Sequence, residues 1–195
     1  STSFKTMQEV SRTSVWQLPS TLNWASYQGA LAKLGQGLLN SARLAIPATL
    51  LSAFLGSMNG YVLSKWKFPG ADTLFALLLF GMFIPYQSIL IPMVRFLQNI
   101  RLYGSIGGLV MVHVVYGIPM TTLLFRNYYT SIPTELVEAG KIDGCSLLGV
   151  YRHIMLPISA PGFVVVMIWQ FTSIWNEFLF AVSVPNNPAS QPATV

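Results

Sequence analysis

Four long apolar stretches constrain the fold of this chain more than any other feature of its sequence. They cover about residues 38–63, 73–97, 105–125 and 158–182, and each is close to or above the ~20 residues with which a helix crosses a bilayer. Of all residues 53% are hydrophobic and 9% are charged, whereas charged residues make up about a quarter of a soluble domain. The sequence therefore predicts an all-α fold, a polytopic transmembrane helical bundle.

The polar residues exclude several other classes of function. The net charge of +5 comes from eleven Lys and Arg scattered along the chain, so no basic stripe suited to nucleic acid is present. The single cysteine, Cys145, cannot form an internal disulfide. His113 has no other His, Cys or carboxylate at ligand spacing, so we expect a packed, neutral histidine and no metal site. Gly140-Lys141 lacks the surrounding residues of a phosphate loop, so this chain is not expected to bind ATP.

Two of the predicted spans carry residues that bear on packing. The second contains Pro85 and Pro92, each of which removes a backbone donor and should bend or interrupt the helix. We therefore expect a kinked helix that faces protein. In the first span, Gly56 and Gly60 form a small-xxx-small pair typical of a close helix crossing. This span is also unusually polar and should face protein or water; its polar residues are Asn40, Ser41, Ser52, Ser57 and Asn59.

One charged loop, residues 126–157, separates the third and fourth predicted spans. Residues 132–142 read as a short helix that breaks at Asp143-Gly144, a dipeptide typical of turns. Apolar residues at three-to-four-residue spacing predict a second short helix over 145–154, before Leu156-Pro157 starts the fourth span. The loop is therefore predicted to be two short helices joined by a sharp turn.

The charged loop and the loop with Lys65 and Lys67 lie on the same side of a four-span bundle. Together they hold five of the eleven Lys and Arg residues, and the positive-inside rule makes this side cytoplasmic. Residues 1–37, which show no sustained helical stripe, then form an extracytoplasmic arm, and residues 38–182 form the transmembrane core. Residues 183–195 are expected to be extracytoplasmic and to lead to a further helix, and another helix is expected to precede Ser1.

The charged loop carries the most specific pattern of the sequence. It runs Glu138-Ala139-Gly140, then Gly144, then Ile154, Leu156 and Pro157. This pattern resembles the EAA signature of ABC importer permeases, with Gly140 where the family usually has Ala.

The resemblance extends beyond the loop. Pro133, the run Ile142-Asp143-Gly144 and the run Trp175-Asn176-Glu177-Phe178 resemble the maltose-type carbohydrate permeases, from about Leu38 onward. The chain is thus similar to the second permease of such a system, with the type I, MetI-like permease fold. Its tail, residues 187–192, resembles glucose, mannose or glucosylglycerol permeases.

The resemblance implies a transport subunit rather than an enzyme. In such importers a permease supplies half of the translocation path, here for a sugar or small glycoside, in the plasma or inner membrane of a prokaryote. The implied partners are a second homologous permease, two cytoplasmic ATPase subunits and an extracytoplasmic solute-binding protein. ATP and Mg would bind the ATPase subunits, so no cofactor is expected on this chain.

The resemblance also implies that the charged loop, residues 126–157, couples the permease to the ATPase subunits, and it implies roles for single residues of this loop. The small Ala139 and Gly140 would permit close approach to an ATPase cleft, and Glu138 would face a basic group of that partner. Asp143-Gly144 would be the hinge, because glycine reaches backbone angles closed to other residues. Ile154 and Leu156, followed by Pro157, would anchor the loop to the spans.

Other polar and aromatic residues are candidates for the solute path: Asn40, Asn59, Trp175, Asn176 and Glu177. For the two asparagines the alternative is that they hold helices together, as small and polar residues do in membranes. Glu177 falls near the outer end of the fourth span, so an interfacial role is the alternative there.

Two other classes of membrane protein fit the sequence less well. A secondary transporter or channel subunit would carry paired intramembrane charges or inverted repeats, and neither is evident. A membrane enzyme would need converging His, Glu or Asp groups, and the sequence offers no such cluster. Both alternatives also leave the charged loop unexplained.

Overall fold

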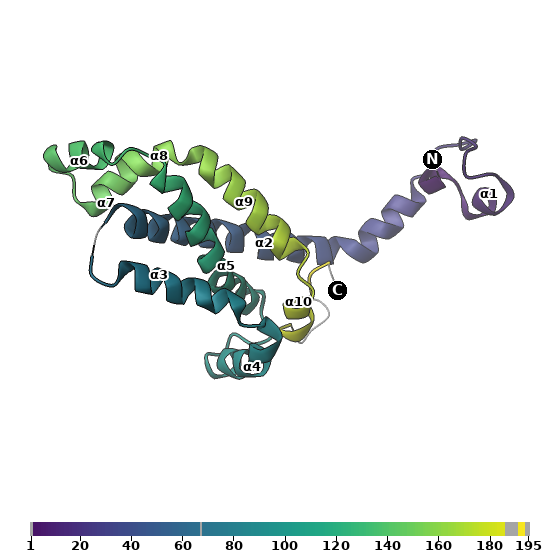
Figure 1. Ribbon diagram of the computed structural model, residues 1–195. Helices are drawn as coiled ribbons and strands as arrows, with labels where there is room; N and C mark the ends of the chain where they lie inside the picture. Colours follow the sequence, from purple (N-terminus) through teal and green to yellow (C-terminus); the bar gives the residue numbers. More distant parts are fainter. Residues whose placement is uncertain (1, 67, 186–190, 194–195) are drawn as a thin grey trace.

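The computed structural model describes residues 2–66, 68–185 and 191–193, and these residues form helices without any β-strand (Figure 1). The all-α prediction is confirmed. The α-helices are α1 (Met7–Arg12), α2 (Ala25–Lys65), α3 (Ala71–Phe80), α4 (Leu90–Asn99), α5 (Ile106–Thr130), α6 (Glu135–Ile142), α7 (Leu147–Val150), α8 (Leu156–Ile158), α9 (Ala160–Trp175) and α10 (Leu179–Ser183). Shorter turns are the 3-10 helices η1 (Thr2–Phe4), η2 (Gly81–Phe83) and η3 (Tyr86–Ile89) and the π-helical turn η4 (Tyr151–Met155).

The longest helix, α2, has 41 residues and so spans roughly 60 Å, about twice the thickness of the hydrocarbon layer. It begins at Ala25, so it includes residues 25–37, where the sequence shows no sustained helical stripe. The early part of α2 extends away from the bundle toward the N-terminus and is mostly exposed (Figure 1). Because this segment is exposed on all sides, its sequence has no apolar stripe from which a helix could be predicted. Its Ala, Leu, Lys and Gln residues nevertheless favour a helix.

The centre of the bundle is the close crossing of α2 and α5. A Cβ atom placed on Gly56 would lie 2.2 Å from Thr121 Oγ1, and one on Gly60 would lie 2.7 Å from the backbone nitrogen of Arg126. The hydroxyl of Thr121 donates a hydrogen bond to the carbonyl of Ser52 across the crossing, at 3.0 Å. The predicted small-residue crossing is confirmed.

The second apolar stretch is broken and bends by 90° between residues 83 and 86. The interruption expected at Pro85 is therefore confirmed, and the stretch over 73–97 forms two helical segments instead of one kinked helix. Ile84 is extended (φ −74°, ψ 118°), as the residue before a proline prefers, and Pro85 starts a new turn. Pro92 lies in the first turn of α4, where a missing N–H is tolerated, so it does not interrupt that helix.

The fourth apolar stretch is also divided. The segment α7–η4–α8 meets α9 at an angle of 77° beside Ser159, so Leu156 and Pro157 end the loop and the long helix begins at Ala160. The chain breaks again after Trp175 before α10. Among the described residues, α2 and α5 are each long and apolar enough to cross a membrane, and the two bent pairs bring the number to four if each counts as one span.

The buried apolar residues form two clusters. The loop-end core joins α2, α5 and α9 to the charged loop and comprises Ala53, Tyr61, Phe125, Tyr129, Ile132, Val137, Val150, Tyr151, Met155 and Val166. The far-end core lies toward the start of α5 and comprises Leu44, Ala45, Ala48, Leu97, Leu109, Val112, Val114, Ile174, Phe180 and Val184.

Candidate functional site

The charged loop forms a helical hairpin at the end of the bundle where α2 also ends (Figure 1). Helix α6 stops at Asp143, and Gly144 adopts a left-handed conformation with φ +80°. The N–H of Cys145 donates to the carbonyl of Gly140 at 2.9 Å, which closes the turn. The predicted turn between two short helices is confirmed, and the second helix carries the π-helical turn η4, a feature the sequence did not indicate.

Glycine at position 140 makes a close contact inside the loop. Gly140 is buried, and a Cβ there would lie 2.7 Å from Ile154 Cδ1 and 3.2 Å from Val150 Cγ2. Its small size therefore lets α6 lie against the second half of the loop. In this chain Gly140 faces Ile154 and Val150, whereas Glu138 and Ala139 are exposed.

A buried hydroxyl cluster ties the loop to the two crossing helices. Ser57 of α2 is fully buried; its hydroxyl accepts a hydrogen bond from Tyr151 of η4 at 2.9 Å and lies 2.6 Å from the hydroxyl of Tyr129 in α5. Tyr61 of α2 donates to the carbonyl of Leu147 at 3.2 Å, and its ring lies 5.5 Å from that of Tyr151. We call Ser57, Tyr61, Tyr129 and Tyr151 the tyrosine cluster.

Basic side chains add further ties at the same end. Lys65, at the end of α2, donates to the carbonyl of Ile132, and the Lys141 ammonium lies 4.2 Å from the centre of the Trp66 ring. Arg126 pairs with the exposed Asp72 at 3.0 Å. These contacts attach the loop to the end of α2 and join the end of α5 to α3.

Two of the three residues named as anchors touch the loop-end core. Ile154 and Leu156 are half-buried and pack against the loop-end core, and Pro157 is exposed in α8. The outer surface of the loop combines the exposed acids Glu138 and Asp143 with exposed apolar side chains, namely Leu136 (39% exposed), Ile142 (87%) and Leu148 (59%). Such a mixture is typical of a surface that binds another protein.

The residues proposed for the solute path are not brought together. Asn40 is buried and donates to the carbonyl of Gln191 at 3.0 Å, while Asn59 is half-buried farther along α2. Trp175 stacks on Phe171, with ring centres 5.4 Å apart. The side chain of Asn176, which is exposed, bonds back to the carbonyl of Thr172 at 2.8 Å.

Glu177 lies just before α10 and accepts hydrogen bonds from the backbone at the start of that helix. Both of its carboxylate oxygens accept from the N–H of Phe180, at 2.9 and 3.1 Å, and one lies 3.9 Å from His113 Nε2. The approach of His113 to Glu177 was missed, because 64 residues separate the two in the sequence. Within the described part of the chain, no three His, Cys, Asp or Glu side chains form a group that could hold a metal ion.

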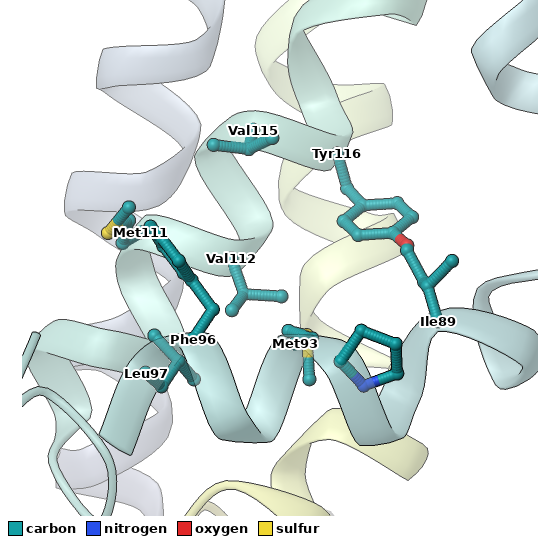
Figure 2. A pocket seen from close by; sticks show the side chains of 9 residues that line it. Ile89, Met93, Phe96, Leu97, Met111, Val112, Val115 and Tyr116 are labelled. Atoms are coloured by element: carbon teal, nitrogen blue, oxygen red, sulfur yellow. The ribbon is translucent and has the colours of Figure 1, made fainter. Parts of the chain in front are cut away.

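An apolar groove runs between α4 and α5 at the far end. Figure 2 shows side chains of Met93, Phe96 and Val112 turned into it, with the ring of Tyr116 at one side. The groove has a volume of about 330 Å³ and almost no polar lining. Tyr116 also lines a second, more polar cavity on the other side of α5.

Comparison with known proteins fits this architecture. Residues 45–193, more than half of the chain, match the family described as "Binding-protein-dependent transport system inner membrane component". The xylose/arabinose import permease protein XacI of Haloferax volcanii is 39% identical over 214 residues, which cover all of this chain and 69% of XacI. The diacetylchitobiose uptake permease NgcG of Streptomyces coelicolor is 32% identical over 183 residues, covering 93% of this chain and 60% of NgcG.

A solved structure shows the same fold. A bacterial ABC transporter involved in the import of the acidic polysaccharide alginate matches with a TM-score of 0.85 at 19% identity, over 98% of this chain and 68% of that one. The fold is that of an ABC importer permease. The chain belongs to the family of inner membrane components of binding-protein-dependent transport systems, whose members are transport components rather than enzymes. It spans about two thirds of the length of the two curated relatives described above.

Proposed function

We propose that this chain is one permease subunit of a carbohydrate importer and that residues 126–157 couple it to cytoplasmic ATPase subunits. The observation that carries the proposal is the attachment of the loop: its outer surface is exposed, while its inner surface is fixed to α2 and α5 by the tyrosine cluster. A push on the outer surface is then transmitted to the two central helices as a displacement rather than absorbed by a flexible connection.

The carbohydrate class is supported by the relatives. XacI is named for xylose and arabinose, NgcG for diacetylchitobiose and the structural match for alginate. These solutes share a ring that bears hydroxyl groups, so a sugar or small glycoside is the proposed cargo. The tail whose likeness pointed to glucose, mannose or glucosylglycerol lies mostly outside the described residues.

The proposed assembly contains a second homologous permease, two ATPase subunits that bind ATP and Mg, and an extracytoplasmic solute-binding protein. In this arrangement the exposed Leu136, Ile142 and Leu148 contact an ATPase cleft, with Ala139 at the point of closest approach and Glu138 facing a basic group. The charged loop then lies on the cytoplasmic side, as the positive-inside rule predicts.

The proposal is tested by co-purifying the full-length permease with its ATPase subunits. Ala139→Trp adds a large side chain at an exposed loop position and should abolish retention of the ATPase subunits by steric clash. Ala32→Trp makes the same change at an exposed position of α2 remote from the loop, and retention should stay normal. Equal retention by both variants would contradict the assignment of the loop, and Glu138→Ala should weaken retention without abolishing it.

A further inference from the structure

Polar side chains gather in one cavity between η3, α5, α9 and α10, at the end of the bundle far from the loop. The cavity has a volume of about 330 Å³, and its polar lining comes from His113, Gln170, Ser173 and Glu177. We call it the polar pocket. Polar side chains within apolar helices are costly to place and mark solute pathways by default, so their convergence needs a functional explanation.

Two polar atoms beside the pocket have no hydrogen-bond partner among the described residues. They are Nε2 of His113, which is 5% exposed, and the hydroxyl of Tyr116. The 3.9 Å between His113 Nε2 and Glu177 is too long for a hydrogen bond. Unpaired buried polar atoms are rare, and these two would find partners if the pocket widened around a ligand that both donates and accepts.

The remaining lining is aromatic. The rings of Tyr86, Tyr116 and Trp169 contribute to the walls, and Trp169 is 39% exposed. Gln170 lies so close to α5 that a Cβ on Gly117 would be 2.2 Å from its amide nitrogen, so the amide packs against α5 at the wall of the pocket. Aromatic faces with a few fixed polar groups suit a ligand that has apolar C–H faces and hydroxyl edges.

We infer that the polar pocket is a subsite for one sugar ring of the transported solute, with Trp169 as the surface on which the ring stacks. The inference rests on the proposed carbohydrate function and adds a place where this subunit touches its cargo. The pocket volume lies at the lower end of the range for small-molecule sites, so it accepts a single ring rather than a long chain. His113, Gln170, Ser173 and Glu177 then bond the hydroxyl groups.

The test uses the whole transporter in proteoliposomes, with its own partner permease, ATPase subunits and binding protein. Labelled xylose, arabinose, glucose and diacetylchitobiose are the probes, and sugar uptake and ATP hydrolysis are measured in the same vesicles. Trp169→Ala should lower uptake at least about tenfold, as expected for the loss of a main binding contact, and leave the stimulated ATP hydrolysis near the wild-type level. Trp169→Phe should restore most of the uptake.

Phe171 provides the matched control, because it lies on the same helix and is 38% exposed but does not line the polar pocket. Phe171→Ala should keep normal uptake. Ser173→Ala removes one exposed hydroxyl without a packing defect and should lower uptake about threefold, the effect of one lost hydrogen bond.

The outcomes separate the subsite from the proposed function. Normal uptake by Trp169→Ala, or an equal loss in Phe171→Ala, would overturn the subsite while the carbohydrate function stands. A wild-type transporter that takes up none of the four sugars would overturn the carbohydrate function, and the sugar subsite with it.

Discussion

The two ends of the bundle are built differently. At the loop end, aromatic rings and hydroxyl groups pair with one another, and Ser57 bonds to two tyrosines on different elements. At the far end, the helices are broken, the core is mostly aliphatic, and His113 and Tyr116 keep unpaired polar atoms beside a cavity. The hydroxyl groups of the tyrosine cluster are all paired, which stiffens that network, whereas unpaired groups beside a cavity are available to a ligand. The difference suits transmission of force at one end and contact with solute at the other.

The largest expected difference in stability comes from replacing glycine by alanine at one position in each end of the bundle. Gly60→Ala places a methyl group 2.7 Å from backbone atoms of α5 and should destabilise the protein by about 1–3 kcal/mol. Gly81→Ala, at the bend after α3, meets nothing within 4 Å and should be neutral or stabilise by up to ~1 kcal/mol. Thermal unfolding in detergent measures the change in stability of each variant. Equal shifts of the unfolding temperature in the two variants would mean that the two ends are packed alike.

A second pair separates stability from coupling. Gly144 and Gly104 both have φ +80°, so alanine at either position should cost about 1–2 kcal/mol. Only Gly144→Ala distorts the proposed hinge, so it alone should weaken binding of the ATPase subunits. Pull-down of these subunits at matched protein levels checks the expectation, and the same loss in Gly104→Ala would remove the special role of the loop.

A third pair compares paired and unpaired hydroxyl groups. Tyr151→Phe breaks a buried hydrogen bond to Ser57 and should destabilise by about 1 kcal/mol. Tyr116→Phe removes a hydroxyl without a partner among the described residues, so the free energy of unfolding should stay the same or rise slightly. Destabilisation by Tyr116→Phe equal to that of Tyr151→Phe would show that the far-end hydroxyl is paired after all.

The smallest expected effect is that of Gly140→Ala, which restores the residue usual in the family. Alanine favours the helix by about 1 kcal/mol, but its methyl group must displace the flexible end of Ile154. The two effects oppose each other, so the net change in the free energy of unfolding should be within about 1 kcal/mol of zero. Ile154→Val shortens the side chain that the new methyl group would meet. The double variant Gly140→Ala with Ile154→Val should therefore be more stable than the single variant Ile154→Val.

The sequence predicted those features that depend on local patterns. Apolar length predicted helices that cross a membrane, and Asp143-Gly144 predicted the turn because only the local chain decides it. Gly56 and Gly60 predicted the crossing, since two small residues one turn apart leave room for another helix. The motif from Glu138 to Pro157 pointed to the family that comparison with known proteins then showed.

Features that depend on tertiary contacts were missed. Pro85 interrupts its helix as expected, but Pro92 does not. Pro92 falls in the first turn of α4, where a missing N–H is tolerated, and the sequence did not show that a new helix begins there. The bonds of Ser57 to Tyr129 and Tyr151 join residues 72 and 94 positions apart, which no local pattern reveals. The close contact of Gly140 with Ile154 joins residues 14 positions apart and was not predicted for the same reason.

The central claim is that the loop transmits ATPase action while the far end contacts solute. It is tested most directly by measuring ATP hydrolysis stimulated by the sugar-loaded binding protein in reconstituted transporters that carry Ala139→Trp or Trp169→Ala. We predict that Ala139→Trp abolishes the stimulation and that Trp169→Ala, which leaves the loop intact, keeps it near the wild-type level. Normal stimulation in Ala139→Trp would contradict the claim.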